Sequence, residues 1–235
     1  MLKTLSIIIP VYNEEAYITR CLENIINTKI TDWEKEIIVI NDGSTDKTLS
    51  LLQKFKSNKI KIISLPNNLG KGNALKKGIQ TAHGDILIIQ DADLEYDPND
   101  YLVILNKLSH KNIKVVYGSR ILGAKIYHNY NSNIFFLWGG LTLTTIINFL
   151  FGIKLTDQPT CYKAWKKELT LELTSYCQSN GFEFEVEMTA FFAKKNKIYE
   201  VPIRYYPRTI NHGKKIKLSD FIKSVFTAFK CKFSS

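Results

Sequence analysis

The chain has 235 residues, 45% of them hydrophobic and 12% aromatic, so it can build a core and is not expected to be disordered. Lysine and arginine outnumber aspartate and glutamate by 32 to 22, and this net charge of +10 favours anionic partners. The chain carries no recognised DNA or RNA motif, and much of its charge lies in the last 20 or so residues, so we predict no nucleic-acid partner.

The sequence also indicates the cellular compartment and the nature of the N-terminal segment. The four cysteines form no C-x-x-C pair, which predicts reduced thiols in a cytoplasmic protein. Pro10 interrupts the N-terminal apolar run and no small-residue cleavage site follows, so this run is interpreted as a first strand rather than a signal peptide.

Apolar runs alternate with helical patterns along the first half of the chain. Strands are expected at Leu5–Val11, Glu36–Asn41, Ile60–Leu65 and Asp85–Gln90, with helices at 18–26, Thr48–Phe55 and Ala74–Thr81 between them, and later strands at Val115–Tyr117 and Ile198–Tyr205. Continuous apolar runs are typical of strands covered on both faces, and strands separated by helices predict a mostly parallel α/β sheet. We find no repeat or low-complexity linker and expect one domain.

Polar residues follow three of these strands. They are Pro10, Tyr12, Asn13 and Glu14 after the first, Asn41, Asp42, Gly43 and Ser44 after the second, and Asp91, Asp93 and Glu95 after the fourth. Ligands of open α/β sheets bind beyond the carboxyl ends of the strands, so these groups mark one candidate site.

The stretch "ILIIQDADLEYDP" (86–98) places three carboxylates at every second position. If the segment stays extended, Asp91, Asp93 and Glu95 point to one side. Two carboxylates about 4 Å apart repel by roughly 4 kcal/mol at an effective dielectric of 20, and a hard divalent cation offsets this. The pattern therefore predicts a Mg²⁺ or Mn²⁺ site that also holds a diphosphate. The alternative is a solvated acidic turn.

Two loops have both a functional and a structural interpretation. In "INDGSTDKT" (40–48), Asp42 either faces a base or ribose hydroxyl or belongs to a turn and helix cap. In "NNLGKGNALKKG" (67–78), Lys71 either reaches a phosphate or is solvated, and the spacing is not that of a Walker motif.

Eight stretches occur in an order that resembles a known family: "SIIIPVYNEE", "EIIVINDGSTDKT", "NLGKGNALKKG", "GDILIIQDADLEYDP", "VVYGSR", "LTDQPTCYKAW", "GFEFEVEMTA" and "EVPIRYYPRT". They are similar to the inverting glycosyltransferases of family 2, especially the branch with dolichol-phosphate mannose synthase and bacterial polyprenyl-phosphate sugar transferases. The resemblance implies a three-layer, Rossmann-like GT-A domain with a mostly parallel central sheet over residues 1–210, with the family motifs concentrated in 5–165. Residues 211–235 are then a basic amphipathic tail.

The resemblance also implies a nucleoside-diphosphate sugar donor, linked to GDP or UDP, and Mg²⁺ or Mn²⁺. The residues expected to border the nucleoside are Pro10, Tyr12, Asn13, Glu14 and Asp42. Asp91, Ala92 and Asp93 are expected at the diphosphate and metal, with Glu95 as the third metal-side residue. Arg120 and Arg204 match arginines that approach phosphates, the alternative being ordinary surface ion pairs.

The acceptor decides whether a base is needed. A polyprenyl phosphate is already an anion, whereas a hydroxyl of a soluble acceptor requires a general base. Asp157 is the main candidate for that base, with Glu183 and Glu185 behind it; each is alternatively a structural hydrogen-bond acceptor. The segment 127–140 carries no lysine or arginine where relatives bind the lipid phosphate, which favours the soluble alternative.

Two apolar segments bear on membrane contact. A helix over 134–151 would span about 27 Å, but its glycines, threonines and asparagine argue against a membrane span, leaving a helix packed on the sheet or one dipping into the interface. In the tail, Leu218, Phe221, Ile222, Val225, Phe226 and Phe229 follow helical spacing among lysines. That helix either lies on an anionic membrane, at the inner face of the cytoplasmic membrane, or packs on the domain.

Overall fold

The structure is a computed structural model that describes residues 2–55, 57–128, 134–208 and 218–233, with only the backbone described for 134–136. A seven-stranded sheet lies at its centre, in the order β3-β2-β1-β4-β6-β5-β7. The strands are β1 (Lys3–Val11), β2 (Trp33–Asn41), β3 (Ile60–Ser64), β4 (Ile86–Ile89), β5 (Val115–Ser119), β6 (Lys163–Lys166) and β7 (Ile198–Pro202). All neighbours pair in parallel except β6, which is antiparallel to β4 and β5. The predicted mostly parallel sheet is confirmed.

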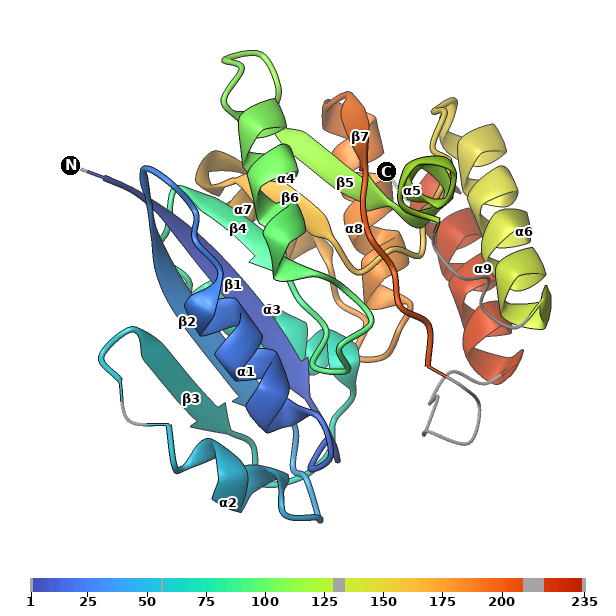
Figure 1. The fold of residues 1–235 in the computed structure, drawn as a ribbon. Coiled ribbons are helices and arrows are strands. Elements are labelled where there is room, and N and C mark those ends of the chain that lie inside the picture. The colour runs from blue at the N-terminus through green and yellow to red at the C-terminus, as the bar shows by residue number, and fades with distance from the viewer. Residues whose placement is uncertain (1, 56, 129–133, 209–217, 234–235) are drawn as a thin grey trace.

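Helices cover both faces of the sheet (Figure 1). They are α1 (Ile18–Asn27), α2 (Thr48–Leu52), α3 (Lys71–Thr81), α4 (Tyr101–Leu108), α5 (Arg120–Tyr127), α6 (Ile134–Phe151), α7 (Thr170–Tyr176), α8 (Phe184–Lys195) and α9 (Leu218–Phe233). Short 3₁₀ turns precede α4 and α7. In α1 the buried positions Ile18, Cys21, Leu22 and Ile25 follow the helical period, which explains how this helix seals one face of the sheet.

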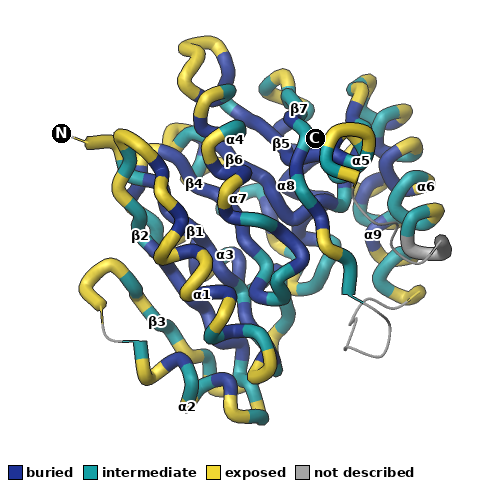
Figure 2. The backbone as a smooth tube through the Cα atoms, viewed as in Figure 1, coloured by how far each residue is buried: buried dark blue, intermediate teal, exposed yellow. Residues whose placement is uncertain are grey.

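The core lies between these layers. β1 and β4 are buried along almost their whole length, as Figure 2 shows in dark blue. This burial on both faces explains their continuous apolar runs. All four cysteines are buried and free.

Strand β6 was not predicted. Its four residues, KAWK, include a buried lysine and give no alternating or continuous apolar signal. Because β6 runs against its neighbours, the segment that precedes it, 155–162, lies at the edge where the parallel strands end. Tyr117 near the end of β5 pairs with Lys163 at the start of β6. Residues such as Asp157 thereby reach the predicted site edge.

Helices α6 and α9 pack against each other at one end of the molecule, and α8 contacts both (Figure 1). A second apolar cluster, separate from the main core, joins them through Leu143, Ile147, Leu150, Val186 and Ala228. Helix α6 therefore packs on helices rather than on the sheet. None of the helices in the described ranges is long and apolar enough to cross a membrane. Residues 129–133 of the neutral segment and the predicted domain–tail boundary at 210/211 lie outside the described residues.

Candidate active site

A cavity of about 1100 Å³ opens at the carboxyl edge of the sheet. One end is lined by residues that follow β1, β2 and β4, together with the start of α3 and Arg208. The other end is lined by α5, α6, α8 and α9. Among the sequence-predicted residues, the cavity is lined by Pro10, Tyr12, Glu14, Asp42, Lys71, Asp91, Ala92, Asp93, Glu95, Arg120 and Asp157.

The Asp42 carboxylate joins the two loops that were singled out in the sequence. Its oxygens accept hydrogen bonds from the backbone N–H groups of Leu69, at 3.0 Å, and Gly70, at 2.8 Å. Gly70 has φ +103°, and a Cβ there would lie 2.4 Å from the carbonyl oxygen of Asn180. A glycine is therefore needed at position 70, where the loop passes close to Asn180 while its N–H donates to Asp42.

Asn13 has a bridging role in this structure. Its φ of 49° is in the left-handed region. Its side-chain oxygen accepts a hydrogen bond from the backbone N–H of Thr45 at 2.8 Å, and its own N–H donates to Ser44 Oγ at 3.0 Å. Asn13 therefore ties the loop after β1 to the loop after β2, and it is not among the side chains that line the cavity.

Glu14, Asp91, Asp93 and Glu95 form an acidic corner of the cavity. Two cations, Lys71 and Arg208, lie against it. Lys71 Nζ lies 2.8 Å from Asp91, and the Arg208 guanidinium lies 2.9 Å from Asp93 and 3.1 Å from Glu14. Burial, followed by the charges of Asp91 and Glu95, raises the pKa of Asp93 to about 7 although Arg208 opposes this. Burial among other carboxylates therefore disfavours the ionised form of Asp93.

Glu95 lines the cavity, and both of its carboxylate oxygens accept hydrogen bonds. One of its oxygens accepts a hydrogen bond from the Tyr205 hydroxyl at 2.8 Å, and the other accepts from the Arg208 backbone N–H at 2.7 Å. Within the described ranges, no three His, Cys, Asp or Glu side chains are gathered as a metal-binding group. Leu94, with φ 65°, breaks the extended alternation that was expected across the three carboxylates of the predicted metal site. Their role as metal ligands stays a prediction. Glu95 lines the cavity together with Asp91 and Asp93, which pair with Lys71 and Arg208.

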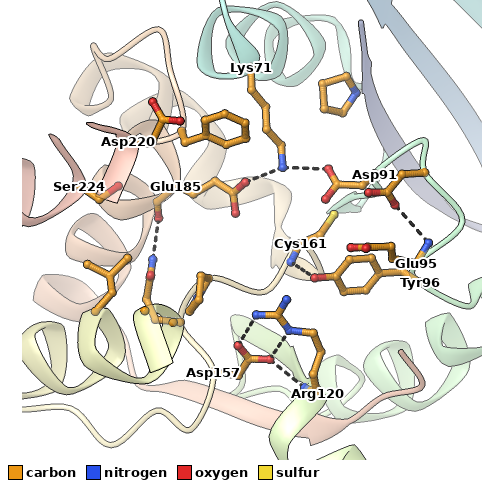
Figure 3. Close-up of a pocket in the computed structure, with 18 of the residues that line it drawn as sticks. Lys71, Asp91, Glu95, Tyr96, Arg120, Asp157, Cys161, Glu185, Asp220 and Ser224 are labelled. Atoms are coloured by element: carbon orange, nitrogen blue, oxygen red, sulfur yellow. Dashed lines mark hydrogen bonds and ion pairs between the residues drawn. The ribbon is translucent and has the colours of Figure 1, made fainter. Parts of the chain in front are cut away.

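Lys71 also belongs to a line of alternating charges (Figure 3). Its Nζ lies 2.8 Å from Glu185, whose other oxygen lies 2.6 Å from the fully buried Nζ of Lys163. Burial disfavours the ionised form of Glu185, but Lys163 and Lys71 override it and lower its pKa to about 2. Asp91, Lys71, Glu185 and Lys163 thus form one network of ion pairs. With this low pKa, the Glu185 carboxylate is a weak proton acceptor, which does not suit a general base.

Arg120 and Asp157 form a bidentate pair (Figure 3). Arg120 Nε and Nη2 each lie 2.7 Å from an Asp157 oxygen, and the Arg120 backbone N–H donates to the same carboxylate at 2.9 Å. Asp157 is almost fully buried. Both of its oxygens are committed to Arg120, which suits orienting that guanidinium and does not suit a general base.

Arg204 lies outside the cavity lining. Its guanidinium pairs with the buried Asp100 and lies over the Tyr127 ring, 4.5 Å from the centroid. This ion pair is neither at the cavity nor an ordinary surface pair, because Asp100 is buried. Arg208, four residues later in the same quoted motif, contacts the acidic corner instead. Arg208 could have been found in the sequence as the second arginine of "EVPIRYYPRT", whereas no sequence pattern marked the buried Lys163.

The opposite end of the cavity is mostly apolar. It is lined by Leu137, Leu141, Leu143, Val186, Leu218 and Phe221, from α6, α8 and α9, with Thr144, Asp220 and Ser224 among them. One continuous cavity therefore joins an acidic, cation-supported end to an apolar end.

In open, mostly parallel α/β sheets, ligands bind beyond the carboxyl ends of the strands, which is where this carboxylate-rich cavity lies. The model of glycosyl transferase family 2 matches residues 6–174, and the chain belongs to this family. It is therefore a glycosyltransferase.

Relatives and solved structures agree with this assignment. The chain is 28% identical to a dolichyl-phosphate beta-glucosyltransferase of Trichomonas vaginalis, over 93% of this chain and 69% of that protein. It is also 28% identical to the glycosyltransferase GlyG of Streptococcus pneumoniae, over 84% of this chain and 68% of that protein. Glucosyl-3-phosphoglycerate synthase of Mycobacterium tuberculosis, solved with Mn²⁺, UDP-glucose and phosphoglyceric acid, shares the fold with a TM-score of 0.74 at 20% identity, over 98% of this chain and 80% of that one.

Proposed function

We propose that this enzyme transfers a sugar from a nucleoside-diphosphate sugar, with inversion, to a polyprenyl-phosphate-type lipid. The observation that carries the proposal is the single cavity with one charged and one apolar end. The charged end suits a nucleoside diphosphate, and the apolar end suits the chain of a lipid acceptor. The family assignment and the likeness to a dolichyl-phosphate beta-glucosyltransferase support the same pairing of substrates.

The donor would lie against the residues after the strands. Pro10, Tyr12, Glu14 and Asp42 would border the nucleoside, and Asp91, Ala92 and Asp93 the diphosphate. Burial of Asp93 near other carboxylates leaves a demand for positive charge, and oxygen ligands of this kind fit Mg²⁺ or Mn²⁺. The solved synthase with Mn²⁺ and UDP-glucose supports this cofactor. Bound there through Asp91 and Asp93, the ion would supply charge neutralisation for the diphosphate.

This chain's own cations complete the electrostatic environment. Lys71 and Arg208 lie beside Asp91 and Asp93, where negative charge develops as the nucleoside diphosphate departs. Fixed positive groups at such a position stabilise the transition state because they need no reorganisation. Glu185 and Lys163 hold Lys71 in place through the ion-pair network.

The geometry around Asp157 favours a phosphate acceptor over a hydroxyl. A hydroxyl acceptor needs a base, and both Asp157 oxygens are engaged by Arg120. An acceptor phosphate needs none, and Arg120, which lines the cavity, is positioned to approach it. We propose that the enzyme acts peripherally at the inner face of the cytoplasmic membrane, where such lipids present their phosphates.

Ligand-induced thermal stabilisation tests the donor half. The wild-type protein is heated with GDP, UDP and their sugar conjugates, with and without Mn²⁺. A ligand present at about 100 times its dissociation constant should add roughly 2.7 kcal/mol to the free energy of unfolding. Mn²⁺-dependent stabilisation that is lost in Asp93→Asn is expected. Equal stabilisation with and without the metal would refute the assigned role of Asp91 and Asp93.

A further inference from the structure

Helix α9 buries three small side chains against the domain and packs Phe221 and Val225 partly on it, but leaves five large apolar side chains exposed. The side chains buried against the domain are Ser224, Ala228 and Cys231. Five large side chains face solvent: Leu218 (75% exposed), Ile222 (47%), Phe226 (72%), Phe229 (44%) and Phe233 (77%). We call these five residues the outward stripe. A helix that only sealed the domain would bury its phenylalanines instead.

The outward stripe is a continuous face. At about 100° per residue, its five members fall within an arc of roughly 80°, on the side of the helix away from the buried small residues. Clustered exposed apolar side chains of this kind mark an interaction surface, because leaving them in water is unfavourable.

Positive charge flanks the outward stripe. Lys223, Lys230 and Lys232 are exposed on α9, and Asp220 is its only acidic residue. Aromatic residues on one face with lysines beside it are typical of helices that lie in the interface of an anionic bilayer. A symmetric contact with a second copy would bring the lysines of both copies together, which is unfavourable.

The stripe is also continuous with the apolar end of the cavity. Leu218 belongs to both, and Phe221, on the next turn, lines the cavity. Helix α6, which packs on α9, exposes Trp138 (64%) and Phe149 (86%). A surface that binds here would lie next to the opening through which a lipid acceptor would enter.

We propose that the outward stripe of α9 docks the enzyme on an anionic lipid bilayer, with the helix lying in the plane of the interface and the lysines contacting lipid phosphates. We infer this from the exposed outward stripe and the lysines beside it. Only the link to a lipid acceptor rests on the proposed function.

Co-sedimentation of the full chain with vesicles tests it. Vesicles of phosphatidylcholine alone are compared with vesicles in which phosphatidylglycerol replaces part of the lipid. The double variant Phe226→Gln/Phe233→Gln should lower partitioning into anionic vesicles about tenfold or more. Leu171→Gln is the matched control, since Leu171 is a 79% exposed apolar residue on α7, and it should leave binding unchanged.

The charges are tested separately. Lys223→Gln/Lys230→Gln should weaken binding to anionic vesicles by roughly fivefold per lysine, whereas Lys29→Gln/Lys54→Gln, at exposed lysines elsewhere, should not. Wild-type protein that ignores anionic vesicles, or a phenylalanine variant that binds them as well as wild type, would overturn the proposal. So would a dimer in light scattering that the phenylalanine variant dissociates without any vesicle binding, since that would assign the stripe to a second copy.

Failure of this inference can be told apart from failure of the proposed function. Mn²⁺-dependent stabilisation by nucleoside diphosphates, measured without vesicles, should be the same in wild type and in the phenylalanine variant. Donor binding without vesicle binding would remove the docking surface and the peripheral location but leave the use of a nucleoside-diphosphate sugar. Vesicle binding without donor binding would remove the proposed transferase function and leave the docking surface.

Discussion

The carboxylate of Glu185 lies 2.6 Å from the ammonium group of Lys163, whose side chain is fully buried on β6. The same carboxylate contacts Lys71 at the mouth of the acidic corner. A buried ion pair at the back of the cavity is thereby connected to a cation that faces the proposed leaving group.

Lys163→Met is expected to destabilise the protein by about 3 kcal/mol or more, because it leaves Glu185 buried with one cation instead of two. Urea unfolding measures this change in the free energy of unfolding. In the control Lys114→Met, which removes a partly exposed pair with Glu168 at 2.8 Å, the change should stay below about 1 kcal/mol. Equal effects of the two variants would show that the Lys163 pair contributes no more than a surface pair.

The lowered pKa of Glu185, about 2 against an ordinary 4.5, predicts how stability depends on pH. A depressed pKa contributes stability that is complete above about pH 4.5 and is lost as the pH falls toward 2. The difference in free energy of unfolding between wild type and Glu185→Gln should therefore be constant from pH 7 to about 5 and shrink below that. A difference that shrinks already between pH 7 and 6 would contradict the pKa direction.

Arg208 lines the cavity and Arg204 does not, so variants of these two arginines can be compared for their effect on kcat. Arg208→Gln should lower kcat by about 100-fold, the usual effect of losing one preorganised donor at a developing charge. Arg208→Lys should recover part of this loss. Arg204→Gln should change kcat little and instead lower stability, because it leaves Asp100 buried without its cation. Steady-state kinetics and urea unfolding of the same preparations separate the two effects, and a larger kcat loss at Arg204 would reverse the assignment.

Asp157 is predicted to position Arg120 rather than to take a proton. Asp157→Asn and Arg120→Gln should lower kcat to a similar extent, and the double variant should be little worse than either, because both remove one unit. The pH–rate profile of Asp157→Asn should keep the shape of the wild-type profile. Loss of a titrating limb in that variant, with Arg120→Gln still active, would restore Asp157 as the base.

Much of the donor end could be predicted because it depends on short-range rules. Continuous apolar runs gave the parallel strands, and parallel strands bring their carboxyl ends to one edge, so Asp42, Asp91 and Asp93 were placed correctly at the cavity. The Gly-rich loop indicated Lys71 as a further candidate. Its ion-pair partners, Asp91 and Glu185, come from distant segments of the chain.

The rest depended on geometry that no local pattern encodes. The positive φ of Leu94 interrupts the extended segment that was expected to align Glu95 with Asp91 and Asp93. The antiparallel β6 brings Asp157 and Lys163 to the edge where the parallel strands end. Arg208 and Arg204 stand in one motif, and only tertiary structure separates the one at the cavity from the one paired with Asp100. The periodicity predicted an amphipathic tail, but it could not tell that Ser224, Ala228 and Cys231 would be its buried residues while Phe226, Phe229 and Phe233 stay exposed.

The central claim is tested most directly by sugar transfer in a defined mixture. Purified enzyme is incubated with Mn²⁺, a radiolabelled nucleotide sugar selected by thermal stabilisation, and either a short-chain polyprenyl phosphate or the matching polyprenol. Metal-dependent label in the polyprenyl phosphate, none in the polyprenol, and loss of transfer in Asp93→Asn are the predicted results. Transfer to the polyprenol or to a water-soluble hydroxyl acceptor, with the phosphate left unlabelled, would contradict the account.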